Sequence, residues 1–139
     1  MVVKLVDYYL KKYGIGPVDA ITRTMVRVRG SYALALMFKD YPGEIYVARK
    51  DSPLVIGTAD GASYLASDVP AILKYTRNVY YIDNLQVGRI SAGEVKFYDL
   101  NGDEVTLPLT CGCALTMLGS PWVAQRVCPM PQVPGSARP

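Results

Sequence analysis

The three cysteines are the residues of this sequence best suited to chemistry, and they lie together near its C-terminal end. Cys111 and Cys113 are separated by one glycine, and Cys128 follows in a proline-rich stretch. A structural zinc site needs about four ligands, and the sequence contains no histidine to complete the set. A dithiol redox site prefers two residues between its cysteines. We therefore expect no metal, no cofactor and no redox function here.

The absence of histidine also excludes a Ser-His-Asp triad and a Cys-His dyad. Two other polar groups could do chemistry, and both have structural interpretations. Arg49, Asp51 and Pro53 are interpreted as a turn that closes two strands, with Arg49 in an ion pair. Ser67 and Asp68 are interpreted as a helix cap.

The remaining polar signals are also structural. Asn101-Gly102 is a two-residue β-hairpin signal. The 11 tyrosines are expected to pack the sheets rather than to stack a ligand. No residue is assigned a catalytic, substrate-binding or metal-binding role.

The composition describes one folded domain and excludes several classes of protein. The chain has 139 residues, of which 50% are hydrophobic and 19% charged, which is enough apolar material for a core. A net charge of +3 from scattered residues indicates neither a nucleic-acid nor a membrane-surface partner. The longest apolar run, residues 33–38, is far shorter than the ~20 residues of a membrane helix. Lys4 and Asp7 interrupt the only candidate signal core, so a cytoplasmic location is expected.

A change in composition divides the chain into two parts. Residues 1–109 hold all the acidic residues and most of the basic ones. Residues 110–139 hold the three cysteines, the one tryptophan and half of the prolines. Proline fits neither a helix interior nor a central strand. We expect residues 1–109 to fold and residues 110–139 to be irregular or disordered.

Two helices are predicted first. Apolar residues recur at helical spacing over residues 2–13, and the glycine at 14 can end that helix. Pro17 suits the first turn of a second helix, whose buried face repeats at steps of three and four as far as Val28. Gly30 is expected to stop it.

The rest of the chain reads as strands with one short helix inserted. Residues 31–38 form a continuous apolar run, suited to a strand buried on both faces. Tyr41-Pro42-Gly43-Glu44 has the chemistry of a type II turn. Further strands are expected at 45–49, 53–58, 62–66, 78–82, 86–91, 95–100 and 104–107, with a helix after Asp68. This segregated order predicts an α+β fold with mainly antiparallel sheets.

Three strings carry a resemblance to a known family. Arg29-Gly30-Ser31-Tyr32-Ala33-Leu34 is followed by Ala48-Arg49-Lys50-Asp51-Ser52-Pro53-Leu54-Val55-Ile56-Gly57 and then by Ala66-Ser67-Asp68-Val69-Pro70-Ala71-Ile72-Leu73. In order and spacing they resemble the second half of the glutaminase domain of glutamine–fructose-6-phosphate aminotransferase (isomerizing), also called glucosamine-6-phosphate synthase. The resemblance runs from about Val2 to about Val105.

The resemblance implies a partial αββα sandwich of the N-terminal-nucleophile, or class II glutamine amidotransferase, type. It also implies hydrolysis of glutamine, whose ammonia is used with fructose 6-phosphate to make glucosamine 6-phosphate. In the family each sheet takes strands from both halves of the domain. Residues on the inner faces, such as Leu34, Leu36, Val55 and Ile56, are therefore expected to lack partners here.

The family's catalytic strings do not occur in this sequence. Its nucleophile is an N-terminal cysteine whose own amino group acts as base, whereas Met1 and Val2 stand first here. The Arg-Trp-Ala-Thr-His loop, the oxyanion Asn-Gly pair and the Thr-Asp-Thr-Glu segment lie upstream of the matched half. We therefore expect an inactive fragment, which self-associates or needs its N-terminal half. The alternative is a non-catalytic interaction module that pairs with another chain.

Overall fold

The computed structural model describes residues 1–92 and 94–111, which form three helices and nine strands. The helices are α1 (Val2–Tyr13), α2 (Pro17–Arg27) and α3 (Val69–Leu73). The strands are β1 (Tyr32–Phe38), β2 (Tyr41–Lys50), β3 (Val55–Ala59), β4 (Ala62–Ala66), β5 (Asn78–Tyr81), β6 (Val87–Ser91), β7 (Glu94–Tyr98), β8 (Glu104–Val105) and β9 (Thr110–Cys111).

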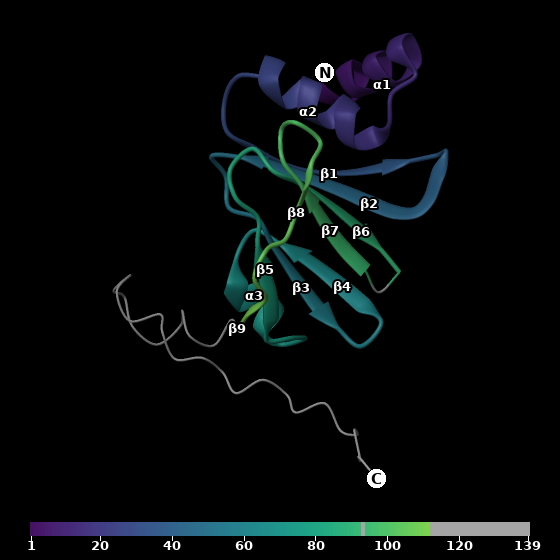
Figure 1. Ribbon diagram of the computed structural model, residues 1–139. Helices are drawn as coiled ribbons and strands as arrows, with labels where there is room; N and C mark the ends of the chain where they lie inside the picture. The colour runs from purple at the N-terminus through teal and green to yellow at the C-terminus, as the bar shows by residue number, and fades with distance from the viewer. Residues whose placement is uncertain (93, 112–139) are drawn as a thin grey trace.

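The strands form two sheets in which every pair of neighbours is antiparallel. One sheet has the order β1-β2-β6-β7-β8 and the other the order β4-β3-β5-β9. Helices α1 and α2 cover the outer face of the first sheet, and α3 lies against the second (Figure 1). The predicted α+β fold with mainly antiparallel sheets is confirmed, and its layers follow the order α-β-β-α.

Three hydrophobic clusters fill the three spaces between these four layers. The first joins α1 and α2 to the outer face of the five-stranded sheet. The second lies between the sheets, and the third joins α3 to the four-stranded sheet. The buried members are, in that order, Val6, Tyr9, Ala20, Ile21, Met25, Tyr46, Ala48 and Val87; Val47, Leu54, Ile56, Ile82, Ile90 and Phe97; and Val55, Val69, Ile72 and Val79.

Both N-terminal helices lie where the sequence predicts them, and their ends have different causes. Gly14 ends α1 in the left-handed conformation at φ 59°, where a side chain would be strained. Pro17 occupies the first turn of α2, as expected. Helix α2 ends at Arg27, because Val28 is already extended at ψ 126°. Gly30 therefore lies three residues beyond Arg27, the last residue of the helix, rather than stopping it.

Strand β1 corrects the expectation of a strand buried on both faces. Its residues alternate between half-buried and exposed along the whole strand. Leu36 turns toward the helices, while the other face carries Ala33, Ala35 and Met37, and Met37 is 75% exposed. Two alanines in the run carry little hydrophobic area, so an unbroken apolar string did not require burial on both sides.

The β1–β2 hairpin also turns earlier than its Pro-Gly signal indicates. Phe38 pairs with Tyr41, so the chain reverses at Lys39 and Asp40. The register then shifts, because Met37 pairs with Ile45. Residues 42–44 form an outward bulge in β2, in which the glycine at 43 takes the positive φ of 81°.

The ordered body extends past the predicted boundary at residue 109. Thr110 and Cys111 form β9 and pair with Val79 and Asn78 of β5. The expectation of an irregular chain from Thr110 onward is therefore wrong for its first two residues. The rest of that expectation, for 112–139, lies outside the described residues.

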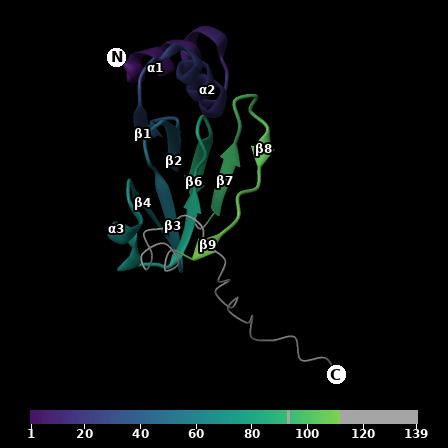
Figure 2. The ribbon, with the colours of Figure 1, turned by 90° about the vertical axis from the view of Figure 1, so that its left-hand side faces the viewer.

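The two flanks of the sandwich differ. On one flank the segment between β8 and β9 passes from the first sheet to the second, and Leu107 packs against the inter-sheet cluster (Figure 2). On the other flank β1 and β4 lie at the sheet edges, each with one neighbouring strand. Among the described residues, the inner-face side chains of these edges stay exposed except for Ser63, which is half-buried. We call this surface the open flank; it consists of Ala33, Ala35, Met37 and Leu65.

The side chains that lack packing partners are not the ones for which the sequence predicts this. Val55 and Ile56 are buried, at 3% and 0% exposure, in two different clusters. Leu34 and Leu36 are half-buried, and Leu36 packs against the helical cluster. The two sheets therefore cover one another at β2 and β3. Among the described residues, cover is lacking only on the inner faces of the edge strands β1 and β4.

Candidate functional site

Arg49 and Asp51 lie where β2 meets the loop before β6, and they hold backbone rather than a ligand. Arg49 Nη1 donates to the Ile82 carbonyl at 2.9 Å, and no carboxylate among the described residues pairs with it. The predicted ion pair of Arg49 is therefore wrong. The reason is that β2 places this side chain over the end of β5, where a free carbonyl accepts it.

Asp51 is held in an unusual backbone conformation by Asn84. The Asp51 amide donates to Asn84 Oδ1 at 2.8 Å, and Asn84 Nδ2 donates to Asp51 Oδ1 at 2.9 Å. Asp51 and Leu85 both have positive φ, at 55° and 62°. The Leu85 amide donates to the Arg49 carbonyl at 3.1 Å. These bonds offset the strain of two left-handed residues, so the junction is a built turn, as the sequence predicts.

The predicted cap of α3 is only half right. Asp68 occupies the N-cap position, but its side chain makes no capping hydrogen bond, and Ser67 is exposed. The Asn101-Gly102 pair lies in the turn between β7 and β8, as predicted, but the hairpin is not a two-residue one, because Tyr98 pairs with Glu104 and residues 99–103 form the loop. Its backbone is held by the Asp99 side chain, which accepts from the Asn101 amide at 2.8 Å.

A polar network on the helix side of the first sheet escaped sequence reasoning. Arg89 donates to Glu44, and the Tyr46 hydroxyl donates to the same carboxylate. Tyr46 and Arg89 are cross-strand partners in β2 and β6, and Glu44 lies two residues earlier on the same face. Residues 45 positions apart meet only through strand register, so no local signal could reveal the group.

This network lines a groove of about 340 Å³ beside the start of α2. The hydrogen bonds from Arg89 and then Tyr46 hold the pKa of Glu44 below its ordinary value. Burial, followed by the bond to Glu44, raises the pKa of Tyr46. The Arg89 cation and the Glu44 carboxylate neutralise one another, so the charge left in the groove is the exposed carboxylate of Asp19, with no cation beside it to make a binding pair.

Acid should weaken the fold partly through Glu44. A carboxyl whose pKa is lower in the folded state contributes stability above its unfolded pKa, near 4.5, and loses it as the pH falls through the folded value. We expect Glu44→Gln to be less stable than the parent at pH 7 and to lose less stability between about pH 5 and pH 3. Urea unfolding across that range measures this difference. Glu94→Gln, on an exposed carboxylate, is the control, and equal acid slopes for Glu44→Gln and the parent would contradict the role of Glu44.

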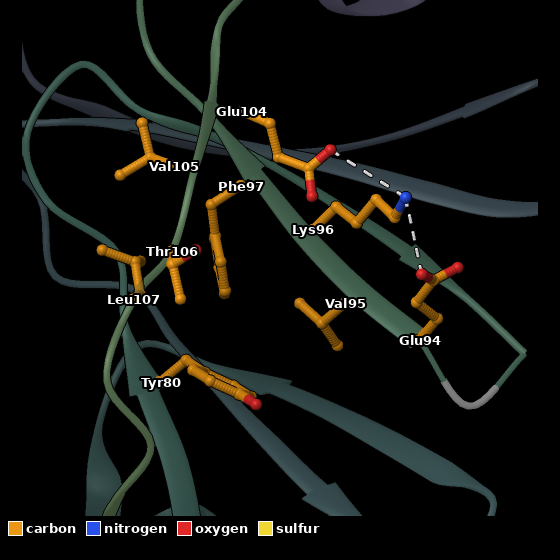
Figure 3. A pocket seen from close by; sticks show the side chains of 9 residues that line it. All are labelled: Tyr80, Glu94, Val95, Lys96, Phe97, Glu104, Val105, Thr106 and Leu107. Carbon is orange, nitrogen blue, oxygen red and sulfur yellow. Dashed lines mark ion pairs between the residues drawn. The ribbon is translucent and has the colours of Figure 1, made fainter.

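A second depression lies beneath β7, β8 and the segment that follows β8 (Figure 3). Its volume is about 200 Å³, below the ~300 Å³ at which small-molecule sites begin. Val95 and Phe97 point toward Tyr80, whereas Lys96 points away from them and toward two carboxylates. Lys96 Nζ lies 3.5 Å from Glu94 and 3.9 Å from Glu104. The groups do not converge on one point, so this depression is no candidate active site.

The cysteine prediction falls largely on residues that the structure leaves undescribed. The backbone of Cys111 lies in β9, and Cys113 and Cys128 lie outside the described residues. Within residues 1–92 and 94–111, no three His, Cys, Asp or Glu side chains gather as metal ligands would. None of the helices in that part is long and apolar enough to span a bilayer.

The open flank is therefore the strongest candidate for a functional surface. Its apolar side chains lie on the faces that elsewhere form the inter-sheet core. Ala35 pairs with the buried Val47, and Leu65 with the buried Ile56. This apolar surface is continuous with the core, and in residues 1–92 and 94–111 no strand pairs with the outer edge of β1 or of β4. Such a surface is suited to receive further strands.

Comparisons with known proteins find one consistent set of relatives. The chain is 42% identical over 105 residues to a glutamine–fructose-6-phosphate aminotransferase [isomerizing] of Caldanaerobacter subterraneus subsp. tengcongensis. It is 38% identical over 101 residues to the enzyme of that name from Clostridium acetobutylicum, and 48% identical over 73 residues to that from Pyrococcus horikoshii.

The matches cover most of this chain and little of the relatives. They span 76%, 73% and 52% of the chain, but only 17%, 16% and 12% of the three relatives. No family model matches the chain. The sequence relationship is thus established for the matched segment, while the relatives contain much that this chain does not.

Proposed function

Because this chain is related over 76% of its length to the glutamine–fructose-6-phosphate aminotransferases, we propose that it is the C-terminal half of a glutaminase domain. In the whole domain, glutamine is hydrolysed and the ammonia supports the synthesis of glucosamine 6-phosphate from fructose 6-phosphate. Residues 1–109 are the glutaminase part in this proposal, and residues 110–139 lie outside the family pattern. The cytoplasmic location stays a prediction.

The single observation that carries this proposal is the relationship at 42% identity, and the layered fold agrees with it. Two antiparallel sheets between helical layers are what the resemblance implies. The role of the chain is then to complete the sheets that hold a catalytic half in place. Arg49, Asp51 and Glu44 fit this structural role, because each is hydrogen-bonded to a neighbouring residue.

Residues 1–139 on their own should not hydrolyse glutamine. The nucleophilic cysteine, its amine base, the oxyanion donors and the aspartate that binds the substrate amino group belong to strings that this sequence lacks. Loss of the nucleophile in a covalent mechanism costs several orders of magnitude. We expect ammonia release from glutamine at the level of a heat-treated sample.

A matched variant makes that measurement decisive. In the variant Cys111, Cys113 and Cys128 are all replaced by Ser, so it has no thiol. The parent and the variant should both match the blank. Release well above the blank in the parent, lost in the variant, would assign a nucleophile to these cysteines and overturn the proposal of an inactive half.

The open flank favours a second candidate function, a non-catalytic module that pairs with another chain. Within the part of the chain that the structure describes, each sheet ends there in a strand with one neighbour, and the exposed inner-face side chains are apolar. This candidate predicts a stable, monodisperse complex with a partner other than a catalytic half. Titration of the purified chain with the N-terminal part of a relative separates the two functions, because only the glutaminase proposal predicts hydrolysis on mixing.

A further inference from the structure

We propose that two copies of this chain pair through the open flank, β1 against β1 and β4 against β4, about a two-fold axis. The flank is the same one that the proposed function offers to a catalytic half. Self-pairing rests on its geometry alone, so the two proposals can fail independently. The occupant is a second copy because neither edge strand carries a charge, and because β1 in its own antiparallel register sets small side chains opposite large ones.

The first observation is the character of the β1 edge. Tyr32–Phe38 contains no charged residue, no glycine and no proline, and its pairing with β2 is unbroken from Tyr32 to Met37. Natural edge strands are usually protected by a lysine, a proline, an interior bulge or a covering segment. Here the bulge begins only after Met37, and helices α1 and α2 cover only the outer face of the strand, so its inner face stays exposed. The edge is therefore open to another strand.

The second observation is that β1 complements itself. An antiparallel pair centred on Ala35 places Ala35 opposite its own copy and Ala33 opposite Met37. The small alanine then faces the long, 75% exposed methionine, so the inner face can pack without a gap or a clash. On the outer face Leu34 lies opposite Leu36. No like charges meet anywhere along the strand.

The third observation is that β4 lies on the same flank and has the same property. Ala62–Ala66 carries no charge, and its inner face holds Ser63 and Leu65. A pair centred on Tyr64 places Leu65 opposite Ser63. A two-fold axis normal to the sheet relates the two strands of such an antiparallel pair, and it gives the self-complementary contact of a closed dimer.

The pairing should depend on concentration. Two short strand edges belong to the small class of interfaces, below about 1,200 Å² in total. We expect the apparent mass from size exclusion with light scattering to rise from one chain to two across a dilution series. A chain that stays monomeric at every concentration, or that grows into open aggregates without a dimer, would overturn the proposal.

Ala35→Glu tests the surface. In the centred register the variant sets two carboxylates opposite one another at the axis, and like charges across an interface are strongly unfavourable. We expect dimerisation to weaken at least about tenfold, with an unchanged circular dichroism spectrum. Val26→Glu is the control, because Val26 is 71% exposed on α2, away from the flank. Equal weakening in both variants would contradict the assigned surface.

Cysteine cross-linking tests the register. In a chain whose own three cysteines are replaced by Ser, Ala35→Cys should form a disulfide with its own copy on mild oxidation. Ala33→Cys should link to Met37→Cys when the two variants are mixed, and should not link to itself. Opposed strand residues lie about 4.5–5.5 Å apart, within disulfide reach. Self-linking of Ala33→Cys with none at Ala35→Cys would reject this register.

A further experiment distinguishes this inference from the proposed function. Adding the N-terminal part of a relative should abolish the Ala35→Cys cross-link if that part occupies the flank. A cross-link that survives, without glutamine hydrolysis, would sink the glutaminase assignment and leave self-pairing intact. If the chain alone forms no cross-link but gains glutamine hydrolysis on mixing, the self-pairing proposal fails and the glutaminase assignment stands.

Discussion

Fused behind the N-terminal part of a relative, the chain should gain glutamine hydrolysis several orders of magnitude above that of residues 1–139 alone. The part to use is the stretch that precedes the matched segment in the Caldanaerobacter enzyme. By the family resemblance, this stretch should begin with a free cysteine and end in Thr-Asp-Thr-Glu. The expected gain is large because nucleophile, base and oxyanion donors arrive together, and such groups act as a unit.

The contribution of this chain to that gain is placement. Catalytic groups must be held within about 0.5 Å of their working positions by the elements behind them. Strands added at the open flank would be aligned by β1 and β4, over apolar residues that are otherwise exposed. Ammonia release is the measurement, and replacement of the supplied N-terminal cysteine by Ser is the control. A fusion that melts cooperatively yet releases no ammonia would contradict the assignment.

Ile56→Ala should be the most damaging single truncation that this structure suggests, at about 2–5 kcal/mol. Ile56 has no exposed surface and lies in the inter-sheet cluster, where Ile82 and Val47 also pack. Truncation leaves a cavity that two rigid sheets cannot close. A small domain has a margin of about 5–15 kcal/mol, so the variant should lose a large part of it.

Leu65→Ala is the matched control for this prediction. Leu65 is the cross-strand partner of Ile56 and points to the same side of the sheet, but it is 37% exposed. We expect it to cost less than about 1 kcal/mol. Urea unfolding of both variants, at one protein concentration because dimers add stability, gives the comparison. Equal losses of unfolding free energy in Ile56→Ala and Leu65→Ala would show that the open flank is covered in solution.

The helices and most strands follow from local sequence. Apolar spacing, Gly14 and Pro17 place α1 and α2 almost to the residue, because caps and periodicity act within a few positions. Asn101-Gly102 lies in a turn for the same reason, and its glycine takes positive φ. The family resemblance could also be detected from short strings of residues. Those strings specify local structure and carry no catalytic group.

What each strand faces was decided only by the assembled sheets. The run from Tyr32 to Phe38 is equally apolar on both sides, and its position at an edge leaves one side exposed. Ile56, expected to lack a partner, is buried because β3 lies beneath β2 and β6. The Glu44–Arg89 pair depends on strand register across 45 residues. Burial and register are sums over distant segments, and local sequence determines only which segments are available to make them.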